Sequence, residues 1–139
     1  MKRMSAVAVA MLISPSLAFA GTSAGMGGGG RFSLYDPIIA QHNGSGEEFR
    51  IVGHCQSSCT LFLGIRNVCV ERNATLLFHA AHLISDPNKT PVDSLTSHMR
   101  AMYTASLASY LDGHGYLSRP QFHAIPGSQM ARFGYRICK

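Results

Sequence analysis

The segment at residues 53–60, Gly-His-Cys-Gln-Ser-Ser-Cys-Thr, constrains the fold of this chain more than any other stretch. It follows the strand-like run Phe-Arg-Ile-Val and leads into the apolar residues Leu-Phe-Leu. A turn of small residues between a strand and a helix presents a serine at a helix N-terminus, where backbone N–H groups and the helix dipole favour a developing negative charge. The segment therefore predicts a strand–turn–helix unit with a serine in the turn.

A second apolar run, residues 74–79, reads as a strand that ends in His79. A serine hydroxyl is a poor nucleophile until a base takes its proton. Neutral histidine is such a base near pH 7, because its reference pKa is about 6.5. Ser57 and His79 therefore suggest a Ser-His hydrolytic site. The alternatives are that Ser57 only caps a helix and that His79 is a core histidine bonded to a backbone carbonyl.

Residues 1–20 have the pattern of a secretory signal peptide. Lys2 and Arg3 precede a short apolar run, and Ala-Phe-Ala at residues 18–20 forms a small-x-small cleavage site. The apolar run is too short to span a bilayer, although a retained N-terminal anchor is the alternative. We therefore expect a secreted or periplasmic protein with one small domain and no membrane span after signal removal.

The even number of cysteines predicts two disulfides in an oxidising compartment. They are Cys55, Cys59, Cys69 and Cys138. Three connectivities are open, and we favour Cys59–Cys69 with Cys55–Cys138, which would tie the C-terminal tail to the turn that holds Ser57. A zinc site is the alternative, but the CxxxC spacing is not the usual CxxC. We therefore expect no metal and no cofactor.

The basic residues are scattered along the chain rather than clustered. Loss of Lys2 and Arg3 with the signal lowers the formal charge from +5 to +3. No basic stripe with interleaved aromatic residues is present, so we expect no nucleic-acid partner.

The remaining pattern predicts an α/β layered domain over residues 31–139, because strands alternate with helices. The composition of the glycine-rich residues 21–30 is typical of a flexible linker. The clearest helix is expected to begin after an N-cap at Thr90 and to end at Gly113. Further predicted elements are a helix at 31–41, a turn at 43–46, a strand at 49–52, a helix at 57–63, a strand at 68–70, and short helices at 119–124 and 128–133. His42 and His54 are expected at the surface.

The pattern Gly-x-Cys-x-Ser-x-Cys-Thr, then Val-Cys-Val, then Phe-His-Ala-Ala resembles small secreted bacterial proteins of the ClpP/crotonase superfamily. In ClpP-type peptidases the nucleophile sits in a Gly-x-Ala-Ala-Ser turn, and the histidine ends an apolar-apolar-His strand. Ser57 and His79 match these positions, and the resemblance covers residues 27–138. It implies a reduced crotonase-type fold and a serine hydrolase, above all a cell-envelope peptidase with a peptide or protein substrate.

The resemblance also implies an oxyanion hole, with one N–H from the glycine pair at Gly29 and one from Ser58. The chain departs from the family because little room remains for a strand before the glycine pair. The third triad member is an aspartate in the family, and none of Asp86, Asp93 and Asp112 sits in a matching motif. The alternative is a non-catalytic envelope protein that keeps the scaffold for binding or assembly, with a homo-oligomer as a further expectation.

Overall fold

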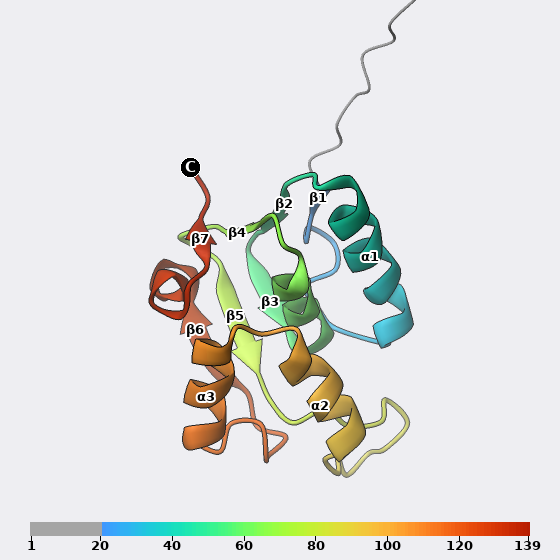
Figure 1. The fold of residues 1–139 in the computed structure, drawn as a ribbon. Helices are drawn as coiled ribbons and strands as arrows, with labels where there is room; N and C mark the ends of the chain where they lie inside the picture. Colours follow the sequence, from blue (N-terminus) through green and yellow to red (C-terminus); the bar gives the residue numbers. More distant parts are fainter. Residues whose placement is uncertain (1–20) are drawn as a thin grey trace, which may run out of the picture.

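The computed structural model describes residues 21–139, and the predicted signal peptide at residues 1–20 lies outside this part. The described chain forms two small sheets with helices packed around them (Figure 1). The first sheet is fully parallel, in the order β1 (Gly21–Thr22), β2 (Phe49–Ile51), β4 (Val68–Val70) and β7 (Arg136–Ile137). The second has the order β3 (His54–Gln56), β5 (Thr75–Phe78) and β6 (His123–Pro126). The predicted α/β class is therefore confirmed.

The chain passes between the two sheets four times, from β2 to β3, from β3 through η2 to β4, from β4 to β5 and from β6 to β7. Within the second sheet, β3 and β5 are parallel, and Gln56 lies opposite Leu77. Strand β6 pairs with β5 in the antiparallel direction. Because β3 and β5 run the same way, the residues that follow them meet at one edge of the sheet.

The start of the glycine-rich segment belongs to the first sheet. Gly21–Thr22 pairs with β2, and the Ser23 N–H donates to the carbonyl oxygen of Arg50 at 3.0 Å. Its hydroxyl oxygen accepts from the Val52 N–H at 2.9 Å. The composition predicted a flexible linker here, but the pairing with β2 shows that the start of the segment is part of the sheet. The strand before the glycine pair is therefore present, although it is only two residues long.

The first helices lie close to their expected positions. After a short 3₁₀ turn η1 (Phe32–Leu34), α1 (Asp36–Ser45) begins with Pro37 in its first turn, as predicted. It runs through the predicted turn at 43–46 and ends at Gly46, which has a φ of 75°. The helix after the serine turn is the 3₁₀ helix η2 (Ser57–Gly64), and the predicted helix at 128–133 is η3 (Gly127–Phe133).

The long helix expected after Thr90 is two helices, α2 (Asp93–Ala101) and α3 (Ala105–Gly113). The break follows from Thr104, whose hydroxyl oxygen caps α3 by accepting from the Leu107 N–H. Thr90 is not a cap, because α2 begins after Val92. The helix predicted at 119–124 is also wrong, since residues 123–126 form β6 against β5.

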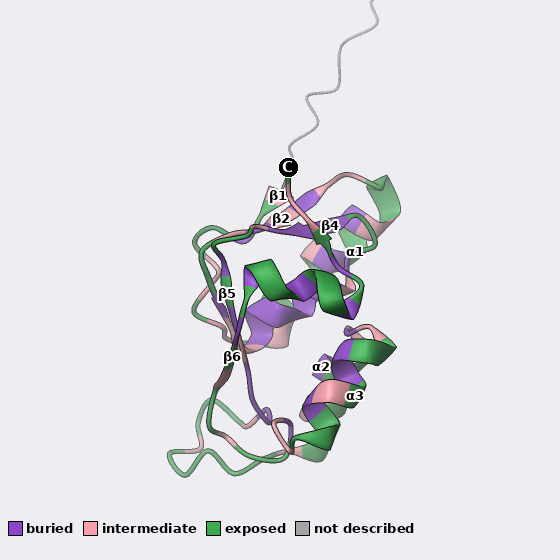
Figure 2. Cartoon of the chain, turned by 90° about the vertical axis from the view of Figure 1, so that its left-hand side faces the viewer, coloured by how far each residue is buried: buried purple, intermediate pink, exposed green. Residues whose placement is uncertain are grey.

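The core lies between the sheets and the helices, where Figure 2 shows the buried residues in purple, and η2 contacts both sheets as well as α1 and α2. Residues 58–63 of η2 are all buried. His42 is buried as well, in contact with Phe49, which contradicts the surface position expected for it; His54 is exposed. Within residues 21–139, no helix is both long enough and apolar enough to cross a membrane.

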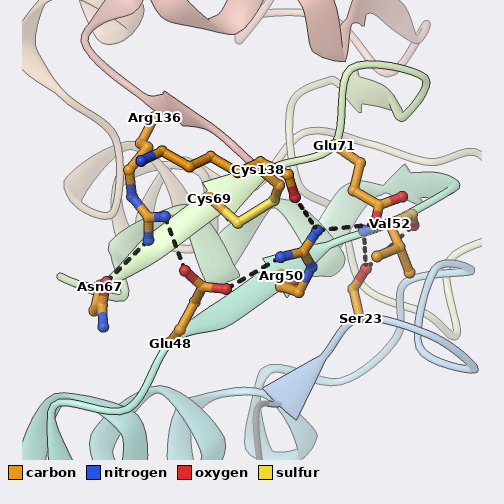
Figure 3. Close-up of a disulfide and its surroundings, with 10 residues drawn as sticks. Ser23, Glu48, Arg50, Val52, Asn67, Cys69, Glu71, Arg136 and Cys138 are labelled. Atoms are coloured by element: carbon orange, nitrogen blue, oxygen red, sulfur yellow. Dashed lines mark hydrogen bonds and ion pairs between the residues drawn. A yellow bond between two sulfur atoms is a disulfide. The ribbon is translucent and has the colours of Figure 1, made fainter.

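The disulfides are Cys55–Cys59 and Cys69–Cys138, so the favoured pairing was wrong although two disulfides form. Cys69 lies on β4 and Cys138 directly follows its neighbour β7, which places their Cα atoms 5.0 Å apart. Ion pairs among Glu48, Arg50 and Arg136 surround this bridge (Figure 3). The C-terminal tail is therefore fixed to the first sheet, far in the chain from the serine turn.

Candidate active site

Ser57 and His79 lie side by side at the carboxyl ends of two neighbouring parallel strands. Ser57 follows β3 directly and His79 follows β5 directly. The register Gln56↔Leu77 brings the two side chains to the same edge, although they are 22 residues apart in sequence. The Ser57 Oγ lies 2.7 Å from the His79 Nε2, which is hydrogen-bonding distance.

Ser57 has an unusual backbone conformation, with a φ of 54°. A residue with a side chain rarely adopts this region, and holding it there costs about 1–3 kcal/mol. Such strained residues cluster at functional sites, and a sharp strand-to-helix turn exposes a serine hydroxyl. Ser57 is not a helix cap, because Gln56 is the N-cap of η2 and has no side-chain capping bond.

A buried chain of hydroxyl groups holds the Ser57 carbonyl. The Thr60 hydroxyl donates to the carbonyl oxygen of Ser57 at 2.7 Å. Because that hydroxyl has one proton, the Tyr103 hydroxyl, also 2.7 Å away, must donate to Thr60. Burial raises the pKa of Tyr103, so the phenol keeps the proton that it donates. Residue 103, between α2 and α3, is thereby linked to the serine turn.

The Cys55–Cys59 disulfide encloses the same turn. Its cysteines are fully buried, and their Cα atoms are 5.2 Å apart. The bridge joins β3 to the first turn of η2, with Gln56, Ser57 and Ser58 between its ends. This ring limits the freedom of the backbone at Ser57.

His79 is buried, with 3% of its surface exposed. Its pKa is lowered to about 4, mainly because burial penalises the charged form of the ring and to a smaller extent because His82 and Lys89 are close by. The ring of Phe122 packs against the imidazole at 4.6 Å between centroids. His79 is therefore neutral at neutral pH, as a proton acceptor must be, but it is a weak base.

No carboxylate orients His79 among the residues that the structure describes. Its Nδ1 is buried and has no hydrogen-bond partner there, so the alternative of a bond to a backbone carbonyl is also contradicted. Asp86 accepts from the N–H groups of Asn88 and Thr90, and Asp112 binds Arg100. Asp93 begins α2. The arrangement within residues 21–139 is a pair rather than a triad.

The missing partner affects the tautomer of His79. Accepting the Ser57 proton at Nε2 requires the imidazole's own proton to sit on Nδ1, where it meets no acceptor. A buried unpaired donor costs about 1–3 kcal/mol, which favours the tautomer that carries its proton on Nε2. A histidine whose orienting group fails in this way loses about 10⁴ in rate in a serine protease. Any hydrolysis here is expected to be slow.

The backbone of Gly29 lies against Ser57. A Cβ at Gly29 would be 2.9 Å from the Ser57 Cβ, which is too close for a side chain. The φ of Gly29 is 77°, which also favours glycine. Its N–H donates to no protein group within residues 21–139. The flanking residues fix this loop: Gln56 Nε2 donates to the Gly28 carbonyl oxygen, and the Ser58 hydroxyl to that of Gly30.

The N–H of Ser58 belongs to the first turn of η2, whose N–H groups lack partners inside the helix. Gly29 and Ser58 are therefore the candidate residues whose N–H groups would meet a negative charge that develops at Ser57.

A hollow of about 330 Å³ opens over the pair. Its lining residues include Gly29, Gln56, Lys89 and Phe122, together with Ser57 and His79. Sequence reasoning missed Lys89 and Phe122, because the loops that hold them carry no motif. It also missed the bond from Thr60 to Tyr103, although Thr60 stands inside the serine motif.

Within the described residues, no group of three or more His, Cys, Asp or Glu side chains is placed to hold a metal ion. All four cysteines are in disulfides. Comparisons of the chain with protein-family models, with curated proteins and with solved structures found no match.

Proposed function

We propose that this protein is a secreted serine hydrolase, a peptidase of the cell envelope, built on a reduced ClpP/crotonase-like scaffold. The observation that carries the proposal is the 2.7 Å contact between the Ser57 Oγ and the His79 Nε2 at a serine with a positive φ. The two disulfides fit an oxidising compartment, which supports the envelope as its location.

In this mechanism His79 takes the Ser57 proton while the Ser57 Oγ attacks the scissile carbonyl carbon. The N–H groups of Gly29 and Ser58 stabilise the resulting oxyanion. The C–N bond then breaks, and the leaving amine takes the proton from His79. Water attacks the acyl-serine in the same way, releasing the acid and restoring the Ser57 hydroxyl.

A fluorophosphonate probe tests the proposal, because it phosphonylates a serine that a base activates. We expect the wild-type protein to gain one adduct that peptide mapping by mass spectrometry assigns to Ser57. Ser57→Ala should abolish labelling. Ser58→Ala is the matched control, since it removes a neighbouring hydroxyl and should leave the adduct. Absence of labelling in the folded wild-type protein, or labelling that survives Ser57→Ala, contradicts the proposal.

The second candidate is a non-catalytic binding or assembly protein that retains the scaffold. Two observations favour it: the His79 Nδ1 has no partner within residues 21–139, and a histidine with a pKa of about 4 is a weak base. In that case Ser57 stays unlabelled although the protein is folded. The same probe experiment therefore separates the two candidates.

A further inference from the structure

A second hollow, of about 400 Å³, lies next to the one over Ser57. The two share the lining residues Gly30, Phe32, His82 and Ile84. The apolar side chains of Leu83 and Leu95 add to the wall of the second hollow. The candidate active site therefore continues into a pocket with mainly apolar walls, which we call the apolar pocket.

Large apolar side chains that are exposed on the described surface gather around these hollows. Leu83 and Ile84 are 54% and 64% exposed and line the apolar pocket, and Phe122 is 46% exposed beside His79. Leu34, which is 59% exposed, approaches Gly30. Single exposed apolar residues are normal, but a cluster of them marks a binding surface.

The charged side chains that line the two hollows are both basic. Arg31 lines the apolar pocket, and Lys89 lines the hollow over Ser57. No Asp or Glu within residues 21–139 lines either hollow. Lys89 forms no ion pair in this part of the chain, whereas Arg50 and Arg100 do. A cleft with one sign of charge attracts ligands of the opposite sign.

The position of Lys89 indicates which part of a substrate it faces. His79 must return its proton to the leaving group, so the leaving group lies on the His79 side of Ser57. Lys89 lines the hollow over Ser57 together with His79, and it does not line the apolar pocket. The apolar pocket instead begins at Gly30 and Phe32, next to the oxyanion donor Gly29.

We propose that the substrate is a short peptide with a large apolar side chain on the acyl side of the scissile bond and a free carboxylate on the leaving residue. The apolar side chain occupies the apolar pocket, and the carboxylate faces Lys89. The inference rests on the proposed function, since it assigns the two sides of the cleft from the proton path through His79.

Binding to the Ser57→Ala protein tests the inference without turnover. We would measure by calorimetry the Kd of benzyloxycarbonyl-Phe-Ala as the free acid and as its C-terminal amide. The acid should bind about three- to fivefold more tightly, in line with one exposed charge pair. In Lys89→Asn this ratio should fall to about two or less. Asparagine suits the site, because residue 89 has a φ of 53° and asparagine tolerates that region.

Arg72→Asn is the matched control, because Arg72 is exposed and lines a different hollow near the C-terminus. It should leave the preference for the acid intact, and Lys89→Arg should retain it. Replacing Phe in the ligand by Ala should weaken binding of the acid about tenfold, because the large apolar side chain is no longer buried in the apolar pocket.

Equal affinity for acid and amide, a preference that survives Lys89→Asn, or no binding of either peptide overturns the inference. So does binding that is indifferent to the Phe side chain. These outcomes are independent of the fluorophosphonate experiment. If Ser57 is labelled but the acid is not preferred, the proposed function is supported and the inference about the substrate is wrong. If the acid is preferred but Ser57 is not labelled, the binding site is supported and the proposed catalysis is wrong.

Discussion

The two disulfides close rings of very different size around different parts of the molecule. Cys55–Cys59 joins residues four apart and encloses the serine turn, whereas Cys69–Cys138 joins residues 69 apart and fixes the C-terminal tail to β4. In the chain-entropy picture the large ring stabilises the fold by about 4 kcal/mol and the small ring by about 2 kcal/mol. The long bridge thus supports the whole domain, and the short one supports the geometry of one residue.

Removing the long bridge should have the largest effect on stability. We expect Cys69→Ala/Cys138→Ala to lower the free energy of unfolding by about 4 kcal/mol, because the unfolded chain regains the freedom of a 70-residue loop. Urea unfolding measures this change. Where the variant is still folded, its rate of fluorophosphonate labelling at Ser57 should stay within about threefold of wild type. A large loss of labelling in the folded variant would show that the tail supports the site.

Removing the short bridge should have the opposite effect, with a large loss of labelling and a small loss of stability. We expect Cys55→Ala/Cys59→Ala to slow labelling of Ser57 about 100-fold, since a displacement of about 1 Å at a reacting group has that effect. Its stability should fall by only about 2 kcal/mol. Labelling kinetics and urea unfolding on the same protein sample give both values. Unchanged labelling would mean that the hydroxyl chain alone holds the turn.

The hydroxyl groups of Thr60 and Tyr103 are the second support of the serine turn, and their removal should have a smaller effect. Thr60→Val deletes the bond to the Ser57 carbonyl oxygen, and we expect labelling to slow about tenfold and stability to fall by about 1–2 kcal/mol. Tyr103→Phe is the matched control, because it removes a bond to Thr60 but none to Ser57. Tyr103→Phe should lower the free energy of unfolding about as much as Thr60→Val does, but it should slow labelling of Ser57 less. Equal effects on labelling would contradict a specific role for the Thr60 bond.

The smallest expected effect is a shift in the pH dependence of Ser57 labelling to lower pH than an ordinary histidine would give. The neutral form of His79 is the base, so labelling should be lost as the pH falls through the pKa of His79. Because that pKa is lowered to about 4, we expect labelling to be constant from about pH 8 to pH 5.5 and to fall below that. An ordinary histidine would already lose activity near pH 6.5. A midpoint near 6.5 in the folded protein would contradict the burial of His79.

The sequence predicted the strand–turn–helix unit and its serine well, because their signals are local. Small residues between an apolar strand and an apolar helix specify the turn without reference to the rest of the chain. His79 could also be placed at the end of a strand from its own neighbours. That these strands lie adjacent and in register is a tertiary property; the resemblance to a family suggested it, and the coordinates of Ser57 and His79 agree.

The disulfide pairing could not be derived in the same way. It depends on which strand lies beside which, and nothing local indicates that β7 pairs with β4 and brings Cys138 to Cys69. The break between α2 and α3 was missed for a different reason. Apolar residues keep a helical spacing through Met99, Tyr103 and Leu107, and only the cap at Thr104 signals a new helix.

The short ladder between β3 and β5 has a consequence for insertions and deletions in this chain. Ser57 and His79 are held together by three paired residues and one turn. Arg72 and Asn73, which are exposed in the turn before β5, lie outside that ladder. One residue added inside 54–57 or 75–79 would turn every following side chain to the opposite face. The contact between Ser57 and His79 is therefore expected to be lost when the register of β3 and β5 shifts by one residue.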